Sequence, residues 1–243
     1  MNEVRVTRRS ARRDCQLLAV GAGPADAMVA LGFLDLEQGH DSNGAAASTF
    51  LAGRTPAGLR PVLRFWDLVS YPAWAQLEPV LRGRWAPQQL SPRLRDVFPA
   101  GAEALTAGPA QALAAVCDFT AHRRLLDVGG GTGSITAAIA RRHPQIQATV
   151  LERAEVVPLA QRRIQAAGLQ SRVRTVAGDA VQGPCPAGHD VVLIANLIHY
   201  FAPGHNRRLP GLARAAVSEG GRLLLADFWD GTENRPRPAA DRR

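Results

Sequence analysis

The chain has 243 residues and a formal net charge of +8, and all 29 of its basic residues are arginines because the sequence contains no lysine. The absence of lysine excludes Schiff-base chemistry, attachment of pyridoxal phosphate and a lysine general base. A hydrophobic content of 46% with 21% charged residues is ordinary for a globular protein of one or two domains. Arginine in place of lysine is also typical of GC-rich codon usage, so the charge is weak evidence for an acidic partner.

Arginines crowd both ends of the chain, in stretches without hydrophobic periodicity. We interpret these stretches as solvated tails rather than nucleic-acid-binding arms, because no aromatic or glycine pattern of a nucleic-acid module accompanies them. We therefore expect no nucleic-acid partner, and disorder at the start of the chain and over residues 230–243. The arginines concerned are Arg5, Arg8, Arg9, Arg12, Arg13, Arg235, Arg237, Arg242 and Arg243.

Cysteine usage and hydropathy indicate the cellular compartment of the protein. Cys15, Cys117 and Cys185 are far apart and lack CxxC or Cys/His partners at metal-ligand spacing, which predicts a reduced, cytoplasmic protein without a metal site. The apolar run 16–22 follows arginines as in a signal peptide, but it is short, and we interpret it as uncleaved. No stretch approaches the roughly 20 apolar residues of a membrane span, so we expect no membrane association.

The first half of the chain has a helical pattern. Within the first region, residues 1–56, the stretch DAMVALGFLDL at 26–36 predicts a short helix, followed by a polar Gly/Ala/Ser-rich segment. Residues 57–119 form a second region, in which apolar spacing of three and four predicts helices with a break at Pro72.

The stretch 17–33 resembles a flavin or nicotinamide loop, with Gly21 and Gly23 in place. We set this alternative aside because Asp26 replaces the third glycine and no acid-tipped strand follows about 20 residues later.

From residue 120 to 229 the pattern changes to alternating strands and helices. Such alternation predicts βαβ units and an α/β fold with a Rossmann-like, doubly wound parallel sheet, whose ligand lies at the carboxyl ends of the strands. The predicted strands cover 123–128, 147–152, 172–178, 190–196 and 221–228, and the predicted helices cover 133–142, 155–167 and 205–217.

A glycine-rich turn follows the first of these strands. The sequence DVGGGTGSIT places Gly129, Gly131 and Gly133 two residues apart, with Asp127 two residues before the first. A dinucleotide loop needs GxGxxG, but Ser134 stands where the third glycine would be. The pattern GxGxG after an acid is found where the ligand is S-adenosyl-L-methionine, and we prefer this reading to a tight turn without a ligand.

Acids also end the next two strands. Glu152 stands 21 residues after Gly131, where a carboxylate can accept hydrogen bonds from both ribose hydroxyls. The sequence AGDA then places Asp179 at the end of the third strand, followed by Ala180, where a carboxylate can accept the adenine amino group. Either acid alone could be an ordinary turn residue. Because the glycine turn and the two acids follow three successive strands in this order, together they predict the cofactor site.

Residues 98–229 resemble the class I S-adenosylmethionine-dependent O-methyltransferases of the caffeate and hydroxyindole type, including bacterial natural-product members. The resemblance is carried by DVGGGTG, Glu152, AGDA and NLIHYFAPGHNRRL at 196–209. Residues 32–53 are similar to the tail of that family's N-terminal winged helix, a dimerisation region, and residues 63–82 are similar to helices that line its substrate pocket. The resemblance implies a small aromatic acceptor and a homodimer or companion subunit.

The resemblance also implies a general base, His199, oriented by an acid 28 residues later, Asp227. Methyl transfer is an in-line displacement, for which an imidazole that takes the acceptor's proton is chemically suited. The family usually has Glu where this chain has Asp227, which leaves open whether the shorter side chain reaches the imidazole. A packed or surface histidine is the alternative for His199, and His189 is expected in a loop or exposed position.

The sequence departs from the family pattern at both ends. The family continues after the fifth strand with a helix, a second supporting acid and a hairpin, whereas here DFW leads into a polar segment, and the first winged-helix elements lack a counterpart before residue 26. We therefore expect a complete cofactor half and an incomplete catalytic half. The predicted function is O-methylation of a small aromatic or polyketide-like hydroxyl, and the alternative is an inactive or partner-dependent S-adenosylmethionine-binding subunit. Methylation of bases is disfavoured, because the fourth strand ends without the Asn/Asp-Pro-Pro-aromatic motif.

Overall fold

The structure, a computed structural model, describes residues 6–7, 23–53, 55, 57–84, 94 and 96–228. The chain divides into two compact units, Met1–Ala107 and Gly108–Arg243. The boundary falls inside helix α7, Val97–Val116. The predicted tail at 230–243 and residues 17–22 of the loop-like stretch 17–33 lie outside the described residues.

The first unit contains a small antiparallel sheet in the order β1-β3-β2, from strands Val6–Thr7, His40–Asn43 and Leu34–Glu37. The helix predicted over 26–36 is wrong in its second half, because helix α2, Gly23–Ala30, ends before Gly32, which has φ +73°. Residues after it instead pair with β3, where Leu36 lies opposite Asp41. Helix α3, Ala45–Phe50, follows the sheet.

A run of helical segments follows: α4 (Arg60–Phe65), η1 (Trp66–Ser70), α5 (Tyr71–Trp74) and α6 (Leu77–Leu81). The break predicted at Pro72 is wrong, because η1 is a π-helical turn that leads directly into α5. In this turn the amide of Tyr71 donates to the carbonyl of Trp66, and the wider turn carries the chain past a residue that has no N–H of its own.

The second unit contains a five-stranded sheet in the order β6-β5-β4-β7-β8, with all neighbouring strands parallel. The prediction of an α/β fold with a doubly wound parallel sheet is confirmed. The strands are β4 (Arg124–Val128), β5 (Gln147–Glu152), β6 (Val173–Ala177), β7 (His189–Ala195) and β8 (Val217–Ala226), and the helices are α8 (Ser134–Arg142), α9 (Val157–Ala166), η3 (Ile198–Tyr200) and α10 (Pro203–Ala216).

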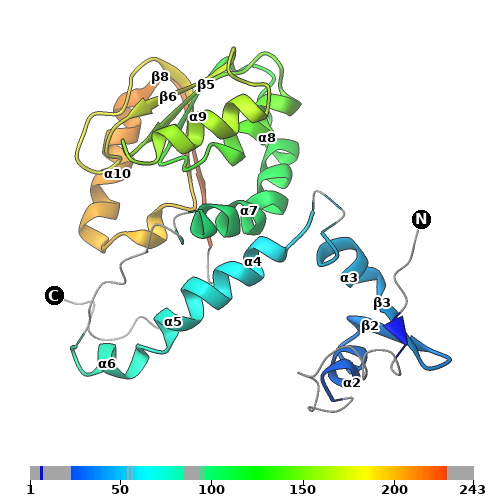
Figure 1. The fold of residues 1–243 in the computed structure, drawn as a ribbon. Helices are drawn as coiled ribbons and strands as arrows, with labels where there is room; N and C mark the ends of the chain where they lie inside the picture. The colour runs from blue at the N-terminus through cyan, green and yellow to red at the C-terminus, as the bar shows by residue number, and fades with distance from the viewer. Residues whose placement is uncertain are drawn as a thin grey trace, which may run out of the picture. The chain divides into compact units, whose positions relative to one another are not determined.

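Helices cover both faces of this sheet (Figure 1). Alternate residues of each strand enter opposite cores, so that Leu125 packs with α8 and α9 while Leu126 packs with α10. Burial on both faces makes most residues of these strands apolar, and this made the strands recognisable in the sequence. The last strand, β8, nevertheless begins at Val217 rather than at the predicted residue 221. The layers leave the carboxyl ends of the strands at one edge, where the predicted site residues lie.

Leu193 in β7 is fully buried, whereas Leu225 in the neighbouring edge strand β8 is 47% exposed. Replacing Leu193 with Ala leaves a cavity in the core, and we expect it to lower the free energy of unfolding by about 2–5 kcal/mol. Leu225→Ala should cost less than about 1 kcal/mol. Urea denaturation of both variants tests this difference. Equal losses of unfolding free energy would contradict the burial of Leu193 and the exposure of Leu225.

Candidate active site

The glycine loop links the end of β4 to the start of α8. The amide of Gly129 donates to the carbonyl of Leu151 at 2.8 Å, which holds the loop against β5. A Cβ on Gly130 would come within 2.6 Å of the Asp127 carboxylate, so the loop packs closely over this side chain. Gly131 has φ +57° and a Cβ there would meet nothing within 4 Å, so this part of the loop faces open space. Gly133 immediately precedes α8.

Asp127 lies beneath the loop and is only 1% exposed. Its Oδ2 accepts a 2.6 Å hydrogen bond from the Thr136 hydroxyl, and its buried Oδ1 has no hydrogen-bond partner among the described residues. Burial raises the pKa of Asp127 to about 6, the Thr136 bond opposes this rise, and the charge of Glu152 adds to it. The geometry makes Asp127 a support for the loop.

Glu152, at the end of β5, is tied to the same loop. Its Oε2 accepts from the amide of Gly131 at 2.8 Å, and its Oε1 accepts from the amide of Arg153 at 2.8 Å. Each carboxylate oxygen has a second lone pair, so Glu152 keeps the capacity to accept from ligand hydroxyls. The loop and the acid predicted to share a ligand are therefore in direct contact.

Asp179 follows β6, and the amide of Gly178 beside it donates to the carbonyl of Glu152 at 2.9 Å. The Oδ1 of Asp179 accepts from the amides of Val181 and Gln182, which closes its own turn. No group among the described residues donates to its Oδ2. Ala180 is partly buried and packs against the core beneath the turn.

These residues fit S-adenosylmethionine. The ends of β4, β5 and β6 present an open glycine turn, a carboxylate with spare acceptor capacity and a second carboxylate. Gly131 and Glu152 would hold the amino-acid and ribose portions, and Asp179 would accept from the adenine amino group. The glycine loop and Glu152 are fixed by protein hydrogen bonds, so this part of the site is formed in advance of binding.

His199 and Asp227 meet at the same edge of the sheet, just beyond the ends of β7 and β8. The imidazole Nδ1 of His199, in η3 after β7, lies 2.7 Å from Oδ1 of Asp227, the residue following β8. The shorter aspartate therefore reaches the imidazole. The amides of Leu197 and Ile198 both donate to its Oδ2 at 3.0 Å, which draws the turn toward the carboxylate.

The protonation state of this pair follows from its contacts. Burial alone would raise the pKa of Asp227, but hydrogen bonds from the His199 ring and from the amides of Phe228 and Ile198 hold it below its usual range. An ionised carboxylate can only accept, so Nδ1 of His199 carries the hydrogen between them. The neutral imidazole then has its lone pair on Nε2, the atom able to take a proton.

Leu197 connects the two halves of the site. A Cβ on Gly129 would lie 2.7 Å from Cδ1 of Leu197, so this side chain packs against the glycine loop two residues before His199. Sequence reasoning missed both Leu197 and Thr136, because an apolar residue and a hydroxyl in the first turn of a helix have many ordinary roles. The amphipathic pattern of α8 could have indicated only that Thr136 is buried.

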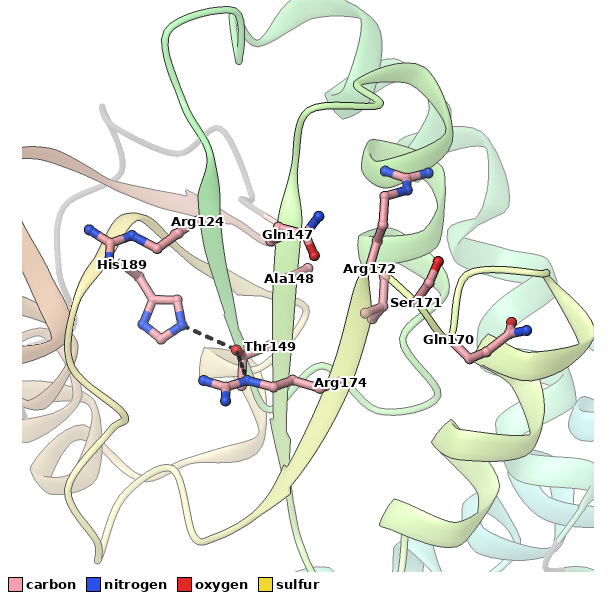
Figure 2. A pocket seen from close by; sticks show the side chains of 10 residues that line it. Arg124, Gln147, Ala148, Thr149, Gln170, Ser171, Arg172, Arg174 and His189 are labelled. Atoms are coloured by element: carbon pink, nitrogen blue, oxygen red, sulfur yellow. Dashed lines mark hydrogen bonds between the residues drawn. The ribbon is translucent and has the colours of Figure 1, made fainter.

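A separate hollow of about 290 Å³ lies at the opposite end of the strands, lined by Arg124, Arg172, Arg174, Thr149 and His189 among others (Figure 2). Arg172 points away from Arg124 and Arg174 in this view and donates to the carbonyls of Pro144 and Ile146. The expectation that His189 is exposed or in a loop is wrong, since it is 4% exposed at the start of β7 and lies 3.2 Å from the Thr149 hydroxyl. The guanidinium groups do not converge on one point.

Within the described ranges, no group of three or more His, Cys, Asp or Glu residues could hold a metal ion. No helix of that same part of the chain is long and apolar enough to cross a membrane.

The pKa of Asp127 makes stability depend on pH. Because the folded chain holds this proton up to about pH 6, against about 4 for an unfolded aspartate, Asp127 stabilises the fold below pH 4 and loses that contribution as pH rises through 6. The side chain of Asp127→Asn stays neutral at every pH. Measured relative to the original chain, the free energy of unfolding of this variant should therefore rise by about 2 kcal/mol from pH 4 to pH 7. Denaturant titrations at both pH values measure this difference, and a pH-independent difference would contradict the burial of the carboxyl.

Residues 81–241 match the O-methyltransferase domain family. The 3-hydroxy-5-methyl-1-naphthoate 3-O-methyltransferase of Streptomyces sahachiroi is 30% identical over 239 residues, which cover 93% of this chain and 69% of that protein. The aclacinomycin 10-hydroxylase RdmB of Streptomyces purpurascens is 41% identical over 114 residues, 46% of this chain and 30% of that protein.

The crystal structure of the S-adenosylmethionine-dependent methyltransferase SibL matches with a TM-score of 0.72 and 32% identity, over 96% of this chain and 73% of that one. The match agrees with the parallel sheet of the second unit. The chain therefore belongs to the O-methyltransferase domain family, whose cofactor is S-adenosylmethionine.

Proposed function

We propose that this chain methylates a hydroxyl of a small aromatic or polyketide-like molecule, with His199 as general base and Asp227 orienting it. The observation that carries the proposal is the 2.7 Å contact between these two side chains, on a turn that packs through Leu197 against the cofactor loop. S-adenosylmethionine supplies a methyl group on a sulfonium, and its transfer to the acceptor oxygen breaks the carbon–sulfur bond. Nε2 of His199 takes the hydroxyl proton, and the Asp227 carboxylate stabilises the resulting imidazolium.

Two exposed aromatic rings support an aromatic acceptor. The ring of Tyr200 lies 4.2 Å from the His199 ring, and the ring of Phe228 lies 6.1 Å away, edge-on at 72°. Tyr200 is 61% and Phe228 is 71% exposed, so both offer apolar surface beside the proposed base. Flat aromatic molecules pack well on such rings. The relative from Streptomyces sahachiroi is named for a hydroxynaphthoate substrate, which agrees with this class.

A second candidate is an S-adenosylmethionine-binding subunit that is inactive or needs a partner, either a second copy or a companion chain. The hydroxylase name of RdmB supports it, because this relative, which aligns with 46% of this chain, is named for a reaction other than methylation. The chain also spans only 69% of the naphthoate methyltransferase. This candidate predicts cofactor binding without methylation by the isolated chain, and methylation on addition of the partner if one is required.

Cofactor binding is tested by calorimetry with S-adenosylmethionine and S-adenosylhomocysteine. Loss of a charge-assisted hydrogen bond is worth about 1.5–3 kcal/mol, so Glu152→Gln should weaken binding by roughly 10- to 100-fold. Glu219→Gln changes the same charge at an exposed position of β8 and should leave affinity unchanged. Absence of binding by the folded original chain would rule out both candidates.

The base is tested by turnover of phenolic and naphtholic acceptors. His199→Ala should lower kcat by about 100-fold or more with cofactor affinity kept, because a positioned base contributes about that factor. His205→Ala, an exposed histidine early in α10, is the matched control and should retain activity. Full activity of His199→Ala would remove His199 from the mechanism, and binding without any turnover by the original chain would favour the second candidate.

A further inference from the structure

The turn that carries His199 is held on its amino-terminal side by Asp227, which accepts from the amides of Leu197 and Ile198. The turn begins at Asn196, which has φ +48°, an uncommon backbone conformation for a residue with a side chain. Its carboxyl-terminal side leads through Phe201 into α10 without a strand to hold it. The position of the imidazole depends on both sides being fixed.

Asn206, in the second turn of α10, supplies the contact on that side. Its Nδ2 donates to the carbonyl of Ile198 at 2.9 Å and to the carbonyl of Phe201 at 3.2 Å. These two carbonyls flank His199 in the chain, so one side-chain amide spans the turn. Because both partners are acceptors, the amide must present its nitrogen to them, which fixes its orientation.

The second polar atom of the Asn206 side chain, Oδ1, makes no such contact within the described part of the chain. The Oδ1 of Asn206 is buried and has no hydrogen-bond partner among the residues described. Burying an unsatisfied oxygen is unfavourable, and an apolar side chain of similar size would avoid that penalty. The two hydrogen bonds that Nδ2 donates to the turn offset this penalty.

We propose that Asn206 is a positioning residue, which fixes the turn carrying His199 and thereby holds the imidazole against Asp227. The proposal rests on the proposed role of His199. Asn206 acts through the backbone of the turn, by its bonds to the carbonyls of Ile198 and Phe201.

The test compares Asn206→Leu and Asn206→Asp with Arg208→Gln in the full chain. Leucine keeps the branching and the number of side-chain heavy atoms and removes both the donor and the unsatisfied oxygen. Aspartate keeps the shape but cannot donate when ionised. Arg208→Gln changes an exposed residue of the same helix and should leave activity unchanged. If one Asn206 variant fails to fold, the other still tests the donor.

We expect kcat to fall by about 10- to 100-fold in both Asn206 variants, the range for a small misplacement of a catalytic group. Cofactor affinity should stay within about twofold. The ¹⁵N chemical shifts of the His199 ring report its tautomer directly. They should indicate protonation at Nδ1 in the original chain and a mixture of tautomers in the Asn206 variants. A purely structural role would alter the denaturation midpoint but neither the ring shifts nor kcat per folded molecule.

Unchanged kcat together with unchanged ring shifts would overturn the proposal, and so would a loss of kcat without any change in the shifts. The failure of the proposed function gives a different result. In that case His199→Ala stays active, while the ring shifts in Asn206→Leu still change and support the positioning role.

Discussion

One buried carboxylate organises the carboxyl-terminal edge of the sheet around His199. Asp227, with a side chain that is 2% exposed, accepts from the His199 imidazole and from the amides of Leu197, Ile198 and Phe228. A buried charge is tolerated when its oxygens are satisfied in this way. The same group therefore joins the end of β8 to the turn after β7 and aligns the imidazole, so the orientation of His199 is inseparable from the geometry of the strand ends.

The cofactor loop is built on the same principle. Glu152 accepts from the amide of Gly131, and Asp127 accepts from Thr136 beneath the loop. Acids at the carboxyl ends of these parallel strands accept hydrogen bonds from the protein's own groups, a backbone amide for Glu152 and a side-chain hydroxyl for Asp127. Such fixed hydrogen bonds organise a polar site before a ligand enters, which reduces the reorganisation that binding and reaction require.

Relatives of this chain are named for different reactions. The naphthoate methyltransferase and RdmB both align with this chain, yet they are named for methylation and hydroxylation. In this chain the exposed rings of Tyr200 and Phe228 lie beside His199, and under the proposed function they would contact the acceptor.

The sequence by itself determined the parallel sheet, the glycine turn and the identity of the acids. The predicted strand 147–152 coincides with β5, and ordered motifs indicated Glu152 and His199. Only the tertiary structure decided that Asp227 reaches the imidazole, that Asp127 is turned under its loop and that Asn206 spans the turn. Periodicity is a local property that neighbouring residues carry, whereas hydrogen bonds between strand ends depend on packing between segments distant in the chain.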